Sequence, residues 1–229
     1  MEKLILWDID GTLLYSGGVA GEAMRAAMER VYGRATSAER HAYAGKTDQQ
    51  IILETFAERA HADLLPLLEH FTATYLAELG SRRDEFLARG YVLEGVADAL
   101  ERLAGAPVVQ SLLTGNLRPV ARFKLDLLDL TRYFDFDAGA YGSDHHTRAN
   151  LVPIAAERAA QRYGRPFAER DMVVIGDTPN DIDCGRAAGA RTIAVATGPF
   201  GVDELRSYGA DMALANLADT EAVIAAILG

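Results

Sequence analysis

The chain has 229 residues, of which 49% are hydrophobic and 24% are charged, and its formal net charge is -10. This composition is typical of a globular protein with one good core, or a core and a small second domain, and it argues against disorder. The acidic balance argues against nucleic-acid binding, and the single Cys184 excludes an internal disulfide. The apolar stretch near the N-terminus is short and runs into acidic residues, so we expect a cytoplasmic protein without a membrane span.

Short apolar runs alternate with segments of helical periodicity along most of the chain. The predicted strands are residues 3–7, 107–113, 172–175 and 192–196, with a weaker fifth at 136–138. The predicted helices are residues 96–104, 118–128, 151–163, 181–188 and 220–228. This alternation predicts an α/β fold in which a doubly wound parallel sheet is covered by helices on both faces.

Residues 16–89 break this alternation, because they show helical periodicity and no strand signal. A run of helices of this length is too long for a crossover between the first two strands, so it predicts an inserted, all-helical domain. We therefore divide the chain into a sheet core, residues 1–15 and 91–229, and a helical domain, residues 16–90. Glycines at both junctions are candidate hinges or plain turns.

Three loops that follow predicted strands are unusually rich in polar residues. They read DIDGT from residue 8, TGN from residue 114 and GDTPND from residue 176. Ligands of open α/β sheets bind beyond the carboxyl ends of the strands, where these loops would meet. Asp8, Asp10, Asp177 and Asp181 would then share a small volume, and two charges ~4 Å apart repel by roughly 4 kcal/mol at an effective dielectric of about 20. Either some of these carboxyls are protonated or a cation sits among them, and oxygen ligands favour Mg²⁺.

Each loop also has an ordinary structural interpretation. Asp-x-Asp-Gly can be a turn, Asn116 can be the N-cap of the next helix, and Thr178 and Asp181 can form a capping box. The joint occurrence of the three loops at the ends of successive strands favours a functional site over three unrelated turns.

The segments DIDGTLL, LLTGN and VVIGDTPNDIDCGRAAGA resemble the haloacid dehalogenase superfamily of aspartate-nucleophile phosphotransferases. The similarity spans nearly the whole chain, and the helical insertion resembles the cap of that family. The resemblance implies a Rossmann-like core and a Mg²⁺-dependent phosphatase of small phosphorylated metabolites, phosphoglycolate among them.

The same resemblance implies roles for the residues of the first two loops. Asp8 would be the nucleophile, and Asp10 the general acid and base. Thr114 and the amides of Gly115 and Asn116 would hold the phosphoryl oxygens. A carboxylate that attacks phosphorus needs its charge repulsion cancelled, and a second carboxyl can protonate the leaving group, so the chemistry agrees with these assignments.

The metal ligands implied by the resemblance are Asp8, the carbonyl of Asp10, and Asp177. Asp181 would act in support, as a water-mediated metal contact or as the partner of a cation. Mg²⁺ is the expected cofactor.

One feature departs from the family, whose members usually place a lysine before the helix that precedes the last catalytic strand. The corresponding residues 142–155 contain no lysine. Lys3 lies at the wrong end of the sheet, and Lys124, about two turns into its helix, is expected on a solvated helix face. By elimination Arg148 is the candidate cation, because it keeps its charge and can grip phosphate oxygens in a bidentate manner; a surface arginine is the alternative.

The segment AGKTDQQ, residues 44–50, has the composition of a loop that approaches a ligand. Lys46 is accordingly a candidate specificity residue, with a solvated helix start as the alternative. Two alternative functions stay open: a sugar phosphomutase, and a weakly active or non-catalytic phosphate-binding protein. For the oligomeric state, a monomer and a weak dimer both stay open.

Overall fold

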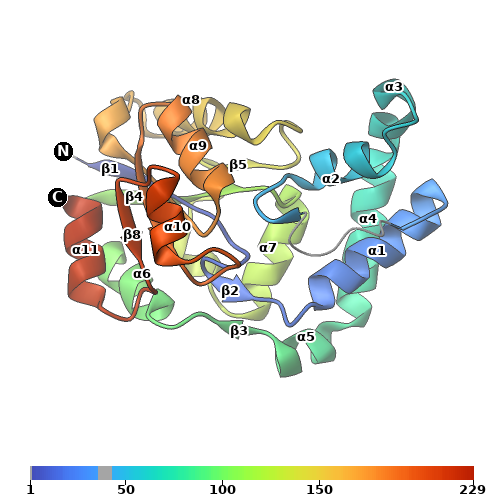
Figure 1. Cartoon of the computed structure of the whole chain (residues 1–229), viewed down its shortest axis with the longest axis horizontal. Helices are drawn as coiled ribbons and strands as arrows, with labels where there is room; N and C mark the ends of the chain where they lie inside the picture. The colour runs from blue at the N-terminus through green and yellow to red at the C-terminus, as the bar shows by residue number, and fades with distance from the viewer. Residues whose placement is uncertain (1, 36–42) are drawn as a thin grey trace.

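The protein, described as a computed structural model over residues 2–35 and 43–229, is built around a six-stranded sheet in which every neighbouring pair is parallel (Figure 1). The strand order is β5-β4-β1-β6-β7-β8. The strands are β1 (Lys3–Trp7), β4 (Val108–Thr114), β5 (Ala140–Tyr141), β6 (Met172–Gly176), β7 (Arg191–Val195) and β8 (Met212–Leu214). Because β1 lies between β4 and β6, the loops that follow these three strands meet at one edge of the sheet.

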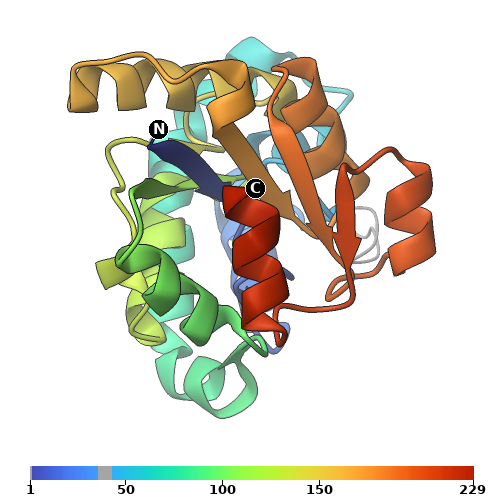
Figure 2. The ribbon, with the colours of Figure 1, turned by 90° about the vertical axis from the view of Figure 1, so that its left-hand side faces the viewer.

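Helices cover both faces of this sheet (Figure 2). On one face lie α8 (Leu151–Tyr163) and α9 (Pro179–Ala187), and on the other lie α6 (Val96–Ala104), α7 (Arg118–Leu127) and α11 (Thr220–Leu228). The alternation of side chains along β1 explains this arrangement, since Ile5 and Trp7 join one buried cluster and Leu4 and Leu6 join another. The doubly wound parallel sheet predicted from the sequence is confirmed.

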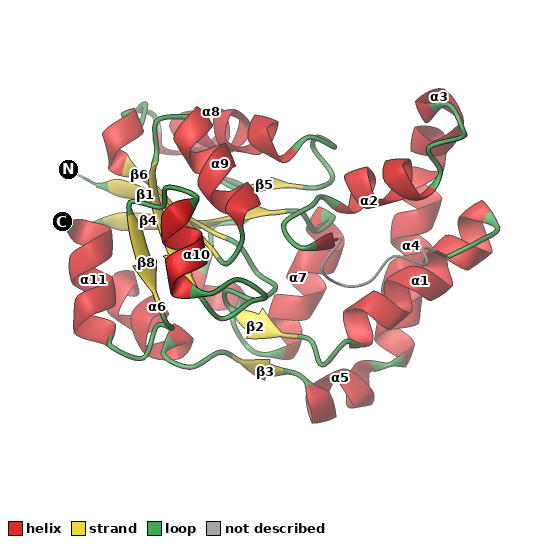
Figure 3. Ribbon diagram, in the orientation of Figure 1, coloured by secondary structure: helices red, strands yellow, loops and turns green. Residues whose placement is uncertain are grey.

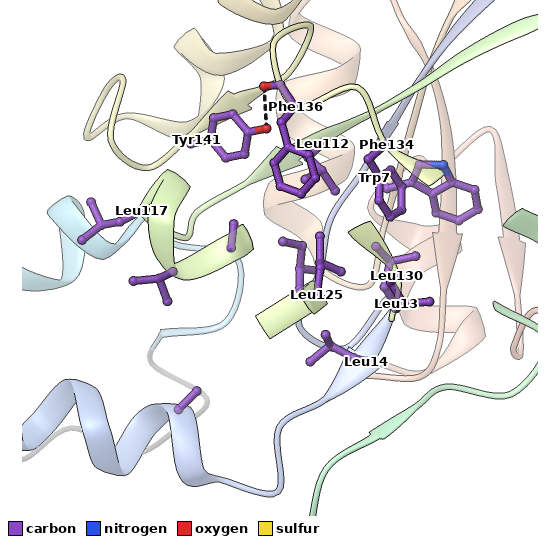
Figure 4. Packing of buried hydrophobic residues seen from close by; sticks show 14 of the residues in the cluster. Trp7, Leu13, Leu14, Leu112, Leu117, Leu125, Leu130, Phe134, Phe136 and Tyr141 are labelled. Carbon is purple, nitrogen blue, oxygen red and sulfur yellow. Dashed lines mark hydrogen bonds between the residues drawn. The ribbon is translucent and has the colours of Figure 1, made fainter. Parts of the chain in front are cut away.

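The larger core cluster surrounds Trp7 at the carboxyl end of β1 (Figure 4). The indole is fully buried, and around it lie the apolar side chains of Leu112, Leu130 and Phe134. Beside them the hydroxyl of Tyr141 donates a 2.8 Å hydrogen bond to the carbonyl of Phe136. A buried aromatic side chain contributes 150–250 Å² of area, to order of magnitude, so this cluster holds the end of β1 in a fixed place.

A helical segment separates β1 from β4 along the chain (Figure 3). It contains α1 (Val19–Tyr32), α2 (Asp48–Thr55), α3 (His61–Leu64), a 3₁₀ turn (Leu65–Leu67), α4 (Leu68–Ser81) and α5 (Arg83–Arg89). The helices gather at one end of the molecule, away from the chain termini (Figure 1). Between residues 16 and 90, the described part of the chain holds no strand, as predicted.

The structure differs from the predicted elements in four places. Residues 136–138 are not a strand, because Phe136 and Ala138 are apolar for core packing rather than for a ladder, and the strand is β5. A two-stranded antiparallel ribbon, β2 (Leu14–Tyr15) and β3 (Tyr91–Val92), was not predicted, since two-residue strands carry no periodicity. The half-buried edge strand β8 and the short helix α10 (Val202–Ser207) also escaped prediction.

Three further 3₁₀ turns complete the described elements: Thr131–Tyr133, Arg148–Asn150 and Glu169–Asp171. Among the described helices, none combines the length and the apolar character needed to cross a membrane.

Candidate active site

Three buried aspartates meet where β1 and β6 end. Asp8 follows β1, Asp177 follows β6, and Asp181 lies in the first turn of α9; one carboxylate oxygen from each lies within 4.8 Å of the others. Two glycines leave room for this cluster: a Cβ atom at Gly11 would lie 2.4 Å from Asp177 Oδ2, and one at Gly198 only 1.7 Å from it. The sequence predicted that four carboxylates share a small volume, and the geometry brings three of them together. Asp10 is not part of this cluster, because its carboxylate is held by Asn116 and Lys124 instead.

The cluster carries more negative charge than its surroundings neutralise. Burial raises the pKa of Asp8 to about 6, although the charge of Arg148 opposes the shift. Burial, with the charges of Asp181 and Asp8, raises the pKa of Asp177 well above its ordinary value. A donor set of carboxylate oxygens without sulfur suits a hard divalent cation such as Mg²⁺, so these residues fit the metal that the sequence implies.

Arg148 lies beside the cluster, at the start of the 3₁₀ turn that precedes α8. Its Nη2 lies 3.3 Å from Asp8 Oδ1 and also contacts Asp181 Oδ1, while Nη1 donates to the carbonyl of Gly45 at 3.1 Å. Burial alone would lower the pKa of the guanidinium, but the carboxylates of Asp181 and Asp8 raise it, so the group stays charged. The candidate cation chosen by elimination therefore lies beside Asp8 and not on the surface.

Asp181 serves two partners at once. Its Oδ2 accepts a hydrogen bond from the amide of Thr178 at 3.1 Å, which is one half of the capping box of α9, and another from the hydroxyl of Thr178 at 2.6 Å. Its Oδ1 faces Arg148. The capping interpretation and the cation-partner interpretation thus describe the two oxygens of the same carboxylate.

The side chain of Asp10 is held by a second cation, Lys124. Its Oδ2 accepts hydrogen bonds from Asn116 Nδ2 at 2.8 Å and from Lys124 Nζ at 2.7 Å, and Lys124 Nζ donates to Asn116 Oδ1 at 2.6 Å as well. The expectation that Lys124 lies on a solvated helix face is wrong, because its side chain is 4% exposed. Residue 124 belongs to the buried face of α7, and side chains on a helix point back toward its N-terminus, so the long lysine reaches the loop.

The loop after β4 is packed tightly. The hydroxyl of Thr114 accepts hydrogen bonds from the side chain of Asn116 at 2.8 Å and from its amide at 3.3 Å. A Cβ atom at Gly115 would lie 2.1 Å from the carbonyl oxygen of Lys46, so only glycine fits there without a shift. Asn116 is not the N-cap of α7; that position is Leu117.

The loop before α2 reaches from the helical segment onto the sheet edge. The backbone amide of Asp48 donates to the carbonyl of Gly115 at 2.7 Å, and the side-chain atom Asp48 Oδ2 accepts from the amide of Leu117 at 2.9 Å. Thr47 Oγ1 donates to the carbonyl of His146 at 2.7 Å. Burial raises the pKa of Asp48 to about 6.

Lys46 lies in the same loop, but its ammonium group is directed elsewhere. Its Nζ lies 2.5 Å from Glu54 Oε2 on α2, and the side chain is 26% exposed. The backbone carbonyl of Lys46 lies against Gly115 in the loop after β4.

Sequence reasoning missed Asp48 and Lys124 as parts of this site. The quoted segment AGKTDQQ contained Asp48, and a count of buried-face positions on the helix from residue 118 would have found Lys124.

Comparisons with known proteins agree with this geometry. The family model of the haloacid dehalogenase-like hydrolases matches residues 2–189. Phosphoglycolate phosphatase from Xylella fastidiosa is 31% identical over 192 residues, which cover 82% of this chain and 77% of that protein. Phosphoglycolate phosphatase from Xanthomonas campestris is 28% identical over 212 residues, which cover 92% and 90% of the two chains.

Tyrosine-protein kinase PtkA from Mycobacterium tuberculosis is also similar, with 27% identity over 205 residues. The match covers 86% of this chain, which spans 62% of the length of PtkA.

Solved structures share the fold. A hydrolase from Pseudomonas syringae superposes with a TM-score of 0.72 at 19% identity and covers 99% of both chains. A HAD hydrolase from Entamoeba histolytica gives a TM-score of 0.70 at 20% identity over the full length of both chains. Two of these relatives are named phosphatases, and one is named a tyrosine kinase. Its motifs, its fold and these similarities together establish that the chain belongs to the haloacid dehalogenase-like hydrolases.

Proposed function

We propose that this protein is a Mg²⁺-dependent phosphomonoesterase that works through a phosphorylated Asp8. The observation that carries the proposal is the pairing of two carboxylates with different surroundings on one loop. Asp8 lies in a buried acidic cluster beside Arg148, whereas the side chain of Asp10 is 36% exposed and held by Lys124. Two carboxylates in distinct environments suit the two roles of nucleophile and general acid.

The proposed reaction has two steps. In the first, a carboxylate oxygen of Asp8 attacks phosphorus, the ester P–O bond breaks, and Asp10 gives its proton to the leaving oxygen. In the second, Asp10 takes a proton from water as the water oxygen attacks phosphorus, and the bond to Asp8 breaks to release inorganic phosphate. Thr114, with the amides of Gly115 and Asn116, would hold the phosphoryl oxygens.

The metal would be held by Asp8, the carbonyl of Asp10, and Asp177. Asp181 lies within the same acidic cluster and would support it through Arg148. Mg²⁺ bound there would offset the negative charge of the phosphoryl group and of the carboxylates. Arg148 adds a fixed positive charge next to Asp8, which supports it as the replacement for the family lysine.

We further propose that residues 16–90 are a cap domain over the core, residues 1–15 and 91–229. The hydrogen bonds from Thr47 and Asp48 to the core support this, because they hold the loop before α2 against the loop after β4. Such a cover favours small phosphorylated metabolites and excludes water from the reacting groups. The two phosphoglycolate phosphatases make phosphoglycolate the first substrate to test. The ion pair of Lys46 with Glu54 would have to open for Lys46 to meet a substrate carboxylate.

The test is release of inorganic phosphate from a panel of small phosphomonoesters that includes phosphoglycolate, with and without Mg²⁺. The parent protein is compared with Asp8→Asn and Asp10→Asn, and with Asp183→Asn as a control on the exposed face of α9. We expect Mg²⁺-dependent release that the first two substitutions abolish and the control retains. No release from folded parent protein would overturn the proposal, and activity that appears only with a sugar bisphosphate would indicate a phosphomutase instead.

A further inference from the structure

We propose that Lys124 is a positioning residue that holds the side chain of Asp10 for proton transfer. The inference rests on the proposed phosphatase function and deepens it by assigning a second cation of the site to a separate task. The motifs that resemble the family lie in the loops after β1, β4 and β6, whereas Lys124 lies within α7.

The two cations of the site have different partners. Arg148 contacts Asp8 and Asp181, which belong to the acidic cluster. Lys124 contacts Asp10 and Asn116, at 2.7 and 2.6 Å. The positive charge is therefore divided between the proposed nucleophile and the proposed general acid.

The geometry at Asp10 restricts the rotation of its carboxylate. The same oxygen, Oδ2, accepts from Lys124 Nζ at 2.7 Å and from Asn116 Nδ2 at 2.8 Å. Asn116 is itself fixed, because its Nδ2 also lies 2.8 Å from Thr114 Oγ1 and its Oδ1 accepts from Lys124. Two donors to the same oxygen restrict the rotation of the carboxylate, and a proton must be delivered along a defined line for general acid catalysis to be efficient.

The burial of Lys124 supports a functional role over a purely structural one. Its side chain is 4% exposed, so its ammonium group has given up nearly all contact with water. Desolvation of the ammonium group opposes its attraction to Asp10, whose side chain is partly exposed. An apolar residue on this buried face of α7, which also holds Val120 and Leu125, would carry no such desolvation cost. The lysine is thus best explained by what it does to Asp10.

The proposal predicts that the effect of removing Lys124 depends on the leaving group. An alkyl alkoxide must be protonated as the P–O bond breaks, whereas p-nitrophenolate leaves without a proton. Release of phosphate from Asp8 needs Asp10 as a base for both substrates. Lys124→Met should therefore slow the first step strongly for an alkyl ester and weakly for p-nitrophenyl phosphate.

The experiment compares kcat/KM of Lys124→Met and parent for phosphoglycolate and p-nitrophenyl phosphate, with Mg²⁺ present, and follows p-nitrophenolate before the steady state. We expect a loss of kcat/KM at least about tenfold greater for phosphoglycolate. We also expect a burst of p-nitrophenolate close to one equivalent of enzyme, because phosphorylated Asp8 accumulates. The matched control is Arg122→Met, which removes an exposed cation from the same helix and should behave like the parent.

If the parent protein is active, two results would overturn this inference while leaving the proposed function intact. One is a loss of kcat/KM in Lys124→Met that is equal for both substrates and comes without a burst. The other is parent-like activity of Lys124→Met. If Lys124→Met does not fold by circular dichroism, Lys124→Arg serves instead: it keeps the charge but changes the reach, and the same difference between the two substrates is expected. An inactive parent would remove the proposed function, and this inference with it.

Discussion

The Nη2 atom of Arg148 lies 3.3 Å from Oδ1 of Asp8 and at the same time contacts Asp181. One guanidinium nitrogen thereby joins the loop after β1 to the first turn of α9. It is a buried positive charge in a cluster that otherwise carries only carboxylates, so we expect its removal to lower the stability of the protein and, on the proposed mechanism, its activity.

Arg148→Met is expected to lower kcat/KM by about 10²–10³, since it removes a preorganised positive charge beside Asp8, the proposed nucleophile. In metal-free buffer it should also lower the free energy of unfolding by about 3–5 kcal/mol, because buried carboxylates lose their partner. Steady-state kinetics and urea unfolding test both effects. Arg162→Met, which breaks a surface pair with Asp135, is the control and should cost less than about 1 kcal/mol. Parent-like kinetics of Arg148→Met would contradict the role given to this residue.

Mg²⁺ is expected to raise the melting temperature of the parent, because a ligand that binds only the folded state stabilises it. Asp177→Asn should remove most of this rise, since it deletes a charged member of the cluster. Asp183→Asn alters an exposed carboxylate of α9 and should leave the rise intact. The measurement is the melting temperature over a Mg²⁺ titration, and an unchanged rise in Asp177→Asn would exclude that residue as a ligand.

The stability of Asp48→Asn is expected to diverge from that of the parent as pH rises. Burial raises the pKa of Asp48 from 3.8 to about 6, so ionisation is disfavoured in the folded state. The contribution of Asp48 to the free energy of unfolding is therefore fully present below pH 4 and is lost as pH rises through 6. The amide keeps an oxygen for the amide of Leu117, so the variant should be more stable above pH 6, by on the order of 1–3 kcal/mol, and unchanged at pH 4.

Urea unfolding at several pH values measures this difference. Asp63→Asn, an exposed carboxylate of α3, is the control and should follow the parent throughout. A constant difference between Asp48→Asn and the parent across the range would show that Asp48 does not titrate as described.

Gly115→Ala is expected to separate two loops that now touch. The added methyl group would lie 2.1 Å from the carbonyl oxygen of Lys46, so the loop before α2 must move. We expect a loss of about 1–3 kcal/mol in unfolding free energy and faster proteolysis of that loop. Gly105→Ala meets its nearest atom at 3.7 Å and is the matched control, with stability equal to or above that of the parent. Both variants can be compared by thermal melting, and equal melting temperatures would contradict the expectation.

The sequence allowed the fold and the acidic cluster to be predicted for the same physical reason. Parallel strands end at a common edge, so polar loops after β1, β4 and β6 had to meet once the strands were recognised. Arg148 could be chosen because no lysine stood in its segment. The first inference needed only the order of elements along the chain, whereas the choice of Arg148 also needed the family resemblance, which places a lysine in that segment.

The rest depends on side-chain direction and on long-range packing. Lys124 was misjudged because its distance was counted along the helix axis, whereas its side chain points back toward the site from the buried face of α7. The carboxylate of Asp48 stood in a polar loop and gave no sign that it would be buried against Leu117. Neither contact has a local signature, since each joins segments far apart in the chain.

The short ribbon of β2 and β3 has a consequence for how the protein can be divided. It pairs Tyr15 with Tyr91 and Leu14 with Val92, so the chain leaves the sheet and returns to it at adjacent points. The ends of the helical segment are thus neighbours, and a tight turn between Tyr15 and Tyr91 would close the gap without crossing the sheet. Residues 16–90 can therefore be removed or exchanged as one piece without changing where the chain leaves and re-enters the core.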